Sequence, residues 1–146
     1  LEHLDDEGEA LGTIRDVLEP EGHLFVTVPA FQALFSADDV AAGHYRRYTA
    51  VRLKKALRQA GFEVLYLTYL FCPLPLPVFL YRVIPTWLGL RTSGESEVAA
   101  SEHAPDGFGA WLLDRILQWE FGVIARGGRM LLGGSCLAVA RRKSSR

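Results

Sequence analysis

The residues best suited to chemistry lie together in one short segment, 43–48 (GHYRRY). Histidine exchanges a proton near neutral pH, which makes His44 a candidate acid or base. Arginine binds carboxylates and phosphates through two parallel hydrogen bonds, so Arg46 and Arg47 are candidate substrate ligands. The segment therefore predicts a site that binds an anionic group and moves a proton.

Two other interpretations of this region stay open. In the first, it is a surface loop whose arginines pair with Asp38 and Asp39 and whose Tyr48 packs on the next helix. In the second, Asp38, Asp39 and His44 bind a metal ion. Because these residues fit no spacing template for metal ligands, we predict no metal site.

A short apolar strand, predicted over residues 23–28 (HLFVTV), must position this segment. β-branched and aromatic residues fill it and no charge interrupts it, which is typical of a strand buried on both faces in a parallel sheet. The loop between Pro29 and Thr49 is longer than most loops inside a domain, and such loops are often functional. Ligands of open parallel sheets bind beyond the carboxyl ends of the strands, so we expect the site in this loop.

The rest of the chain alternates between helix and strand patterns. Hydrophobic periodicity and capping residues predict helices over 5–18, 49–60 and 108–126, and strands over 62–70 and 135–140. This order predicts an α/β fold. Residues 91–107 are small, polar and rich in turn formers, which favours a flexible linker or lid.

Residues 64–81 run without a charge for a length that reaches the threshold of a membrane-spanning helix. Pro73, Pro75 and Pro77 lie inside this run and disfavour a continuous helix. Core packing is one interpretation of the apolar segment 71–90. Another is an amphipathic element that rests on a membrane or covers an apolar substrate pocket.

The composition is that of one globular domain, with 146 residues, 49% hydrophobic and 23% charged. A formal net charge of −1 gives no electrostatic reason to expect a nucleic-acid partner. The two cysteines do not indicate a disulfide framework, so we expect a reduced, cytoplasmic setting. There is no signal-peptide pattern and no initiator Met, and we expect the sequence to be the C-terminal fragment of a longer domain.

Several short motifs together resemble the second half of the class I S-adenosylmethionine-dependent methyltransferases. They are residues 1–4 (LEHL), 18–24 (LEPEGHL), 28–30 (VPA), 43–49 (GHYRRYT) and 60–62 (AGF), with Glu21-Gly22 where the family has Gly-Gly. The resemblance covers residues 1–70 and is weaker over 134–141. It implies a partial Rossmann-like sheet made of the fifth, sixth and antiparallel seventh strands, with a helical insertion at 71–133.

The resemblance also implies a cofactor and an acceptor. Glu2 and His3 would line the S-adenosylmethionine pocket. His44 or Tyr48 would take a proton from the acceptor. Pro29, Phe31, Arg46 and Arg47 would bind it. The glycine-rich turn and the acidic residue with which the family holds the cofactor are absent from these residues, so we expect cofactor binding to need an upstream half.

Two functions follow as alternatives. The first is the C-terminal part of a methyltransferase that acts on a small or lipid-like acceptor, inactive as a fragment. The second is a catalytically inactive module that keeps the fold and binds a membrane peripherally through 71–90. The sequence does not name the acceptor or the oligomeric state.

Overall fold

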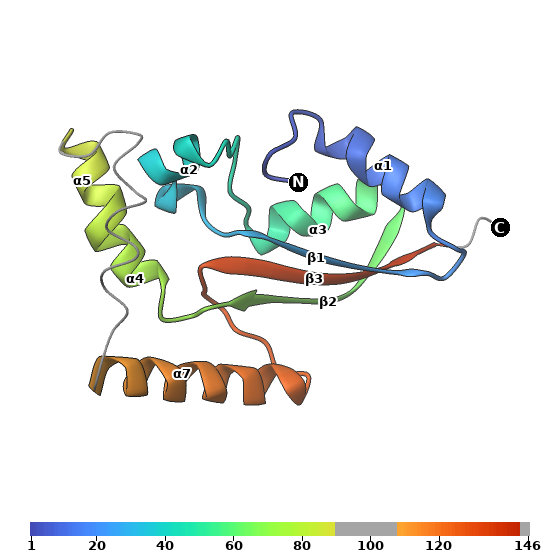
Figure 1. Cartoon of the computed structure of the whole chain (residues 1–146). Helices are drawn as coiled ribbons and strands as arrows, with labels where there is room; N and C mark the ends of the chain where they lie inside the picture. Colours follow the sequence, from blue (N-terminus) through green and yellow to red (C-terminus); the bar gives the residue numbers. More distant parts are fainter. Residues whose placement is uncertain (90–107, 144–146) are drawn as a thin grey trace.

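The computed structural model describes residues 1–89 and 108–143 (Figure 1). The predicted linker at 91–107 lies outside the described residues. The elements are α1 (Glu7–Val17), β1 (His23–Pro29), the 3₁₀ turn η1 (Gln32–Leu34), α2 (Ala37–Ala41), α3 (Ala50–Gln59), β2 (Phe62–Leu70), α4 (Pro75–Val78), the π-helical turn η2 (Phe79–Val83), α5 (Ile84–Trp87), α7 (Phe108–Ala125) and β3 (Ser135–Arg142).

The strands form one three-stranded sheet in the order β1-β3-β2. Strand β3 is antiparallel to both neighbours, so that Ala138 is opposite Val26 on one side and Leu67 on the other. Strands β1 and β2 consequently run in the same direction without pairing. The mixed α/β class and the antiparallel last strand are confirmed. The prediction that β1 lies in a parallel sheet is wrong within the described residues, because β3 occupies the position between β1 and β2.

The prediction that β1 is buried on both faces is also wrong within the described residues. Burial alternates along the strand: Val26 and Val28 are 9% and 1% exposed, whereas Phe25 is 70% exposed. Successive side chains of a strand point to opposite faces, and only the face of Val26 and Val28 lies on the core. An apolar run without charges does not show whether both faces are covered.

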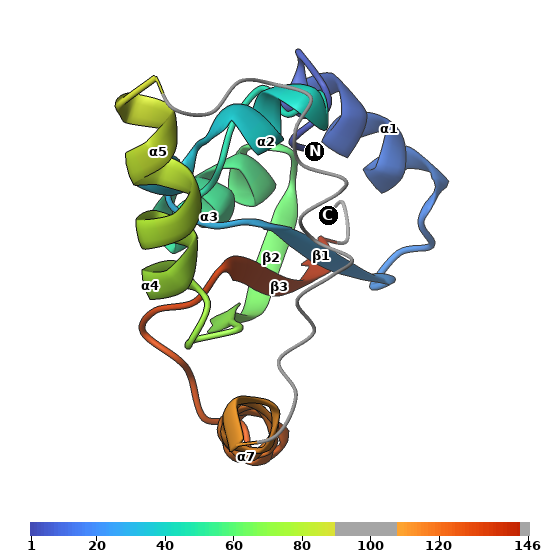
Figure 2. The same ribbon diagram turned by 60° about the vertical axis from the view of Figure 1, so that its left-hand side comes forward.

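Helices α1 and α3 cover the core face of the sheet, and α7 lies on the other side, nearest β2 (Figures 1 and 2). The core joins side chains of α1, α3, all three strands and the loop after β1. Its fully buried members include Leu11, Val28, Tyr48, Leu53, Leu57, Phe62 and Cys136. The loop that carries the candidate site is thus held by the same core as the sheet.

Two of the predicted helices begin at capping residues, α1 two residues later than predicted and α3 at its predicted cap. The Asp6 carboxylate accepts hydrogen bonds from the backbone N–H groups of Gly8 and Glu9 at 2.9 Å each, which starts α1. The Thr49 hydroxyl accepts the N–H of Arg52 at 3.2 Å and starts α3. Each cap satisfies backbone donors that have no partner inside the helix.

Residues 75–87 form a series of short helical turns despite their prolines. Pro75 lies in the first turn of α4, where a backbone N–H has no helical acceptor and its loss costs little. Pro85 lies where the π-helical turn η2 passes into α5. In the described parts of the chain, no helix combines the length and the apolar character needed to cross a membrane.

Candidate functional site

The loop between β1 and α3 returns to the point where it starts. Phe31 N–H donates to the carbonyl of Tyr48, and Tyr48 N–H donates to the carbonyl of Pro29, both at 2.8 Å. These bonds place both ends of the loop at the carboxyl end of β1, as the sequence predicts. The loop is not irregular throughout, since it contains η1 and α2.

Asp39 is the centre of this loop and is 2% exposed. Its carboxylate accepts Nε and Nη2 of Arg47 at 2.9 Å each, in a two-pronged ion pair. It also accepts the backbone N–H of Ser36 and lies 2.9 Å from Nδ1 of His44. One buried carboxylate therefore orients a histidine, an arginine and the start of α2.

These contacts keep Asp39 ionised. Burial by itself would raise the pKa of the carboxyl. Hydrogen bonds from Arg47, His44 and the Ser36 backbone, together with the charge of Arg47, outweigh burial and hold the pKa of Asp39 below its usual range. Asp39 is therefore a permanent anion at neutral pH. The spacing of Ser36 and Asp39 is that of a capping box, the signal by which α2 was recognisable in the sequence.

Three of the predicted site residues, Glu2, His3 and His44, lie close together. Candidate ligand atoms of Glu2, His3 and His44 all lie within 4.8 Å of one another. The rings of His3 and His44 meet edge to face with their centres 4.6 Å apart. The two chain segments are fastened by the backbone, because Tyr45 N–H donates to the Glu2 carbonyl at 2.8 Å.

Both predicted arginines are engaged by the protein itself. Arg47 binds Asp39, as described. Arg46 donates to the backbone carbonyl of Asp5 at 2.8 Å and pairs with Glu7 at 3.5 Å. The alternative interpretation, in which the arginines pair with acidic neighbours, is confirmed for Arg47 with Asp39. For Arg46 the acidic partner comes from α1 and not from the loop.

Tyr48 is fully buried in the core. Its hydroxyl donates to Glu7 at 2.5 Å, and the Arg52 guanidinium lies 5.1 Å from the ring centre. Burial, followed by the hydrogen bond to Glu7 and the charge of Glu7, raises the pKa of Tyr48 far above its usual value. A buried phenol with a raised pKa is poorly placed to take a proton, so this position favours a structural role.

The two apolar candidates lie at the base of the loop. Pro29 is the last residue of β1 and is half-buried. Phe31 stacks on Tyr69 of β2 with ring centres 4.9 Å apart and a 9° angle between the planes. Phe31 has φ +57°, a conformation that costs a non-glycine residue energy and that the surrounding contacts must hold.

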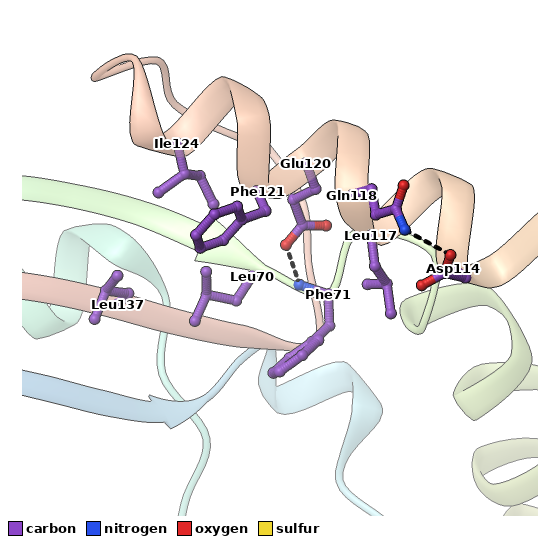
Figure 3. A pocket seen from close by; sticks show the side chains of 9 residues that line it. All are labelled: Leu70, Phe71, Asp114, Leu117, Gln118, Glu120, Phe121, Ile124 and Leu137. Carbon is purple, nitrogen blue, oxygen red and sulfur yellow. Dashed lines mark hydrogen bonds between the residues drawn. The ribbon is translucent and has the colours of Figure 1, made fainter.

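One further buried polar side chain, Glu120 of α7, was not predicted as a site residue from the sequence. A pocket of about 740 Å³ lies between α7 and the end of β2 and is lined mainly by apolar side chains. Figure 3 shows the side chains that line it. Glu120 lies in it, 4% exposed, and accepts the backbone N–H groups of Phe71 and Cys72 at 2.6 and 2.7 Å. The sequence signal that could have indicated this position is a single carboxylate, Glu120, within an otherwise apolar stretch of the predicted helix.

A mixed α/β sheet with polar side chains gathered beyond the carboxyl end of a strand is the arrangement in which α/β proteins bind ligands. The comparison with protein families specifies the class: residues 1–67 match the model of a family described as a methyltransferase domain. This match confirms the resemblance to S-adenosylmethionine-dependent methyltransferases for that part of the chain. No curated protein matches the chain.

Proposed function

We propose that this chain is the C-terminal part of an S-adenosylmethionine-dependent methyltransferase domain that methylates a small or lipid-like acceptor. The observation that carries the proposal is the family match over residues 1–67. That stretch includes β1, the whole loop and α3, and therefore every candidate site residue. The antiparallel last strand and the gathering of polar groups beyond β1 support the same assignment.

In this proposal His44 takes the proton of the acceptor. The Asp39 carboxylate accepts Nδ1–H of His44 at 2.9 Å, which leaves Nε2 as the basic nitrogen. The nearby Glu2 and His3 face the cofactor. Because Arg46 and Arg47 are already bound to carboxyl and carbonyl groups, we assign them to positioning the loop.

The reaction is an in-line displacement. S-adenosylmethionine, held by Glu2 and His3 together with upstream residues, would supply an electrophilic methyl group, which would pass to the acceptor's lone pair as the bond from carbon to sulfur breaks. The acceptor's proton passes to His44. Such a reaction depends mainly on holding the two partners in line, which is the task of a loop closed at both ends by the core.

The first test is a calorimetric titration of S-adenosylmethionine into two proteins, this chain and the same chain extended upstream. We expect the extended chain to bind and this chain alone not to bind at micromolar concentration, since half of the pocket comes from upstream. Glu2→Gln in the extended chain is expected to weaken binding about ten- to a hundredfold, as loss of a charged hydrogen bond costs about 1.5–3 kcal/mol. His23→Gln, at the opposite end of β1, is the matched control. Failure of both chains to bind would contradict the proposal.

A second candidate function is a membrane-peripheral module that keeps the fold without catalysis. Large apolar side chains are unusually exposed on the helical segment after β2 and on α7. They include Leu76 (66%), Trp87 (67%), Leu88 (66%), Trp111 (56%), Trp119 (59%) and Phe121 (72%). Exposed tryptophans with apolar neighbours are typical of surfaces that enter the lipid headgroup region.

Co-sedimentation with vesicles tests this second function. We expect the wild-type chain to pellet with vesicles and the double variant Trp87→Ser/Trp119→Ser to remain in the supernatant. A Trp111→Phe variant keeps the apolar surface and serves as the control. If the wild-type chain does not pellet, the membrane function is excluded, and the methyltransferase proposal is unaffected.

A further inference from the structure

Two histidines and a glutamate from distant parts of the sequence converge at one point of the surface. Glu2 and His3 precede α1, and His44 lies in the loop after β1. Oε1 of Glu2 is 3.9 Å from Nε2 of His3, and ligand atoms of all three residues lie within 4.8 Å of one another. Ligands of a tetrahedral metal ion at about 2.1 Å are separated by roughly 3.4 Å, so small side-chain rotations close this group around an ion.

The histidine rings are already oriented as metal ligands usually are. Nδ1 of His44 faces the Asp39 carboxylate at 2.9 Å, and Nδ1 of His3 faces the Gly43 carbonyl at 3.3 Å. A histidine that binds a metal commonly donates its other N–H to a carboxylate or carbonyl, which sets the tautomer and makes the free nitrogen more basic. Nε2 of both rings is thereby left for a ligand.

Glu2 supplies the negative charge. Its Oε1 lies on the side of His3, 3.9 Å from Nε2 of that ring. A carboxylate oxygen is a common ligand of such ions beside imidazole nitrogens.

We propose that Glu2, His3 and His44 form a binding site for a divalent transition metal ion of the Zn²⁺ or Co²⁺ type. Two imidazole nitrogens and one carboxylate oxygen suit these ions better than Mg²⁺ or Ca²⁺, which prefer oxygen ligands. With three protein ligands and His3 exposed, at least one coordination position stays open to solvent. Such an open position takes water or an oxygen of a small molecule.

The site changes the role of His44 in the proposed reaction. With a metal bound, Nε2 of His44 is a ligand and does not accept a proton. This part of the inference rests on the proposed methyltransferase function. In that case the open position of the metal binds the acceptor oxygen and favours the deprotonated form of the acceptor. Metal binding itself does not depend on that function, and it is measured without cofactor or acceptor.

The test is a titration of tag-free, chelator-treated chain with Co²⁺, followed by its visible absorption, and with Zn²⁺ in competition with a chromophoric chelator. We expect one ion per chain. His3→Gln and His44→Gln are each expected to weaken binding at least about tenfold, comparable to or larger than the loss for an outer hydrogen-bond partner. His3 is exposed, so its replacement leaves the fold intact, and His23→Gln is a matched control that leaves affinity unchanged.

Each result is decisive. One-to-one binding that falls in both histidine variants but not in His23→Gln supports the site. An absence of binding by the wild-type chain overturns it. Binding that persists in His3→Gln and His44→Gln also overturns it, because the ion then lies elsewhere, for example at a cysteine. If S-adenosylmethionine binding fails while metal binding follows this pattern, only the methyltransferase proposal is lost.

Discussion

Replacing Asp39 by alanine is expected to lower the free energy of unfolding by about 3–5 kcal/mol, the usual cost of removing one partner from a buried ion pair. The Arg47 side chain is 11% exposed and has its Nε and Nη2 on this carboxylate. Without Asp39 the guanidinium would stay buried and unpaired. The Ser36 N–H and His44 Nδ1 would lose their acceptor in the same change.

Denaturant unfolding of wild type and variant, followed by circular dichroism, measures this loss. Asp16→Ala is the matched control, since Asp16 also pairs with an arginine, Arg15, but both side chains are exposed. That pair contributes about 0–1 kcal/mol. Asp39→Asn keeps the shape and part of the hydrogen bonding, so an intermediate loss is expected. If Asp39→Ala unfolds within 1 kcal/mol of wild type, the network does not hold the loop.

The chain's local structure was predictable from local signals. Asp6 and Thr49 start α1 and α3 because their side chains accept backbone N–H groups two or three residues ahead, a relation visible in sequence spacing. Gly61 follows α3 with φ +90°, a conformation that glycine adopts without strain. The interactions that decide these features span only a few residues.

The burial and the partners of a side chain were less predictable from the sequence than the conformation of the backbone. Phe25 has the residue type of a buried strand position and is largely exposed, because the cover of a sheet face comes from elements far away in sequence. Arg47 was a candidate substrate ligand on its type alone. Its partner Asp39 is eight residues away, and the choice between pairing and substrate binding depends on how the loop folds.

The convergence of the candidate site is a tertiary property. His3 and His44 are separated by about 40 residues, and their rings meet only because the loop folds back on the segment before α1. The family resemblance placed Glu2 and His3 on the cofactor side and His44 on the acceptor side. The structure shows that these three side chains lie close together, which spacing along the chain does not reveal.

Replacing Glu120 by alanine is expected to release α7 from the sheet. The carboxylate joins α7 to the end of β2 through the N–H group of Phe71, shown in Figure 3, and the N–H group of Cys72. Its removal takes away two hydrogen bonds to a charged acceptor, each worth about 1.5–3 kcal/mol. Because Phe71 is 42% exposed, water replaces part of this loss, and the free energy of opening α7 should fall by about 2–4 kcal/mol. Apolar contacts of Leu117 and Ile124 across the cavity remain, but they are not directional.

Hydrogen exchange is the direct measurement, because it resolves α7 and the Phe71 and Cys72 amides from the rest of the sheet. Glu120→Ala should lose protection in α7 while β1 stays protected. Asp114→Ala removes an exposed carboxylate from the same helix and should change little. The thiol gives a second readout: burial, and then the Glu120 contact, raises the pKa of Cys72 to about 11, so opening should accelerate its alkylation. Unchanged exchange in α7 together with unchanged alkylation would mean that apolar packing alone holds the helix.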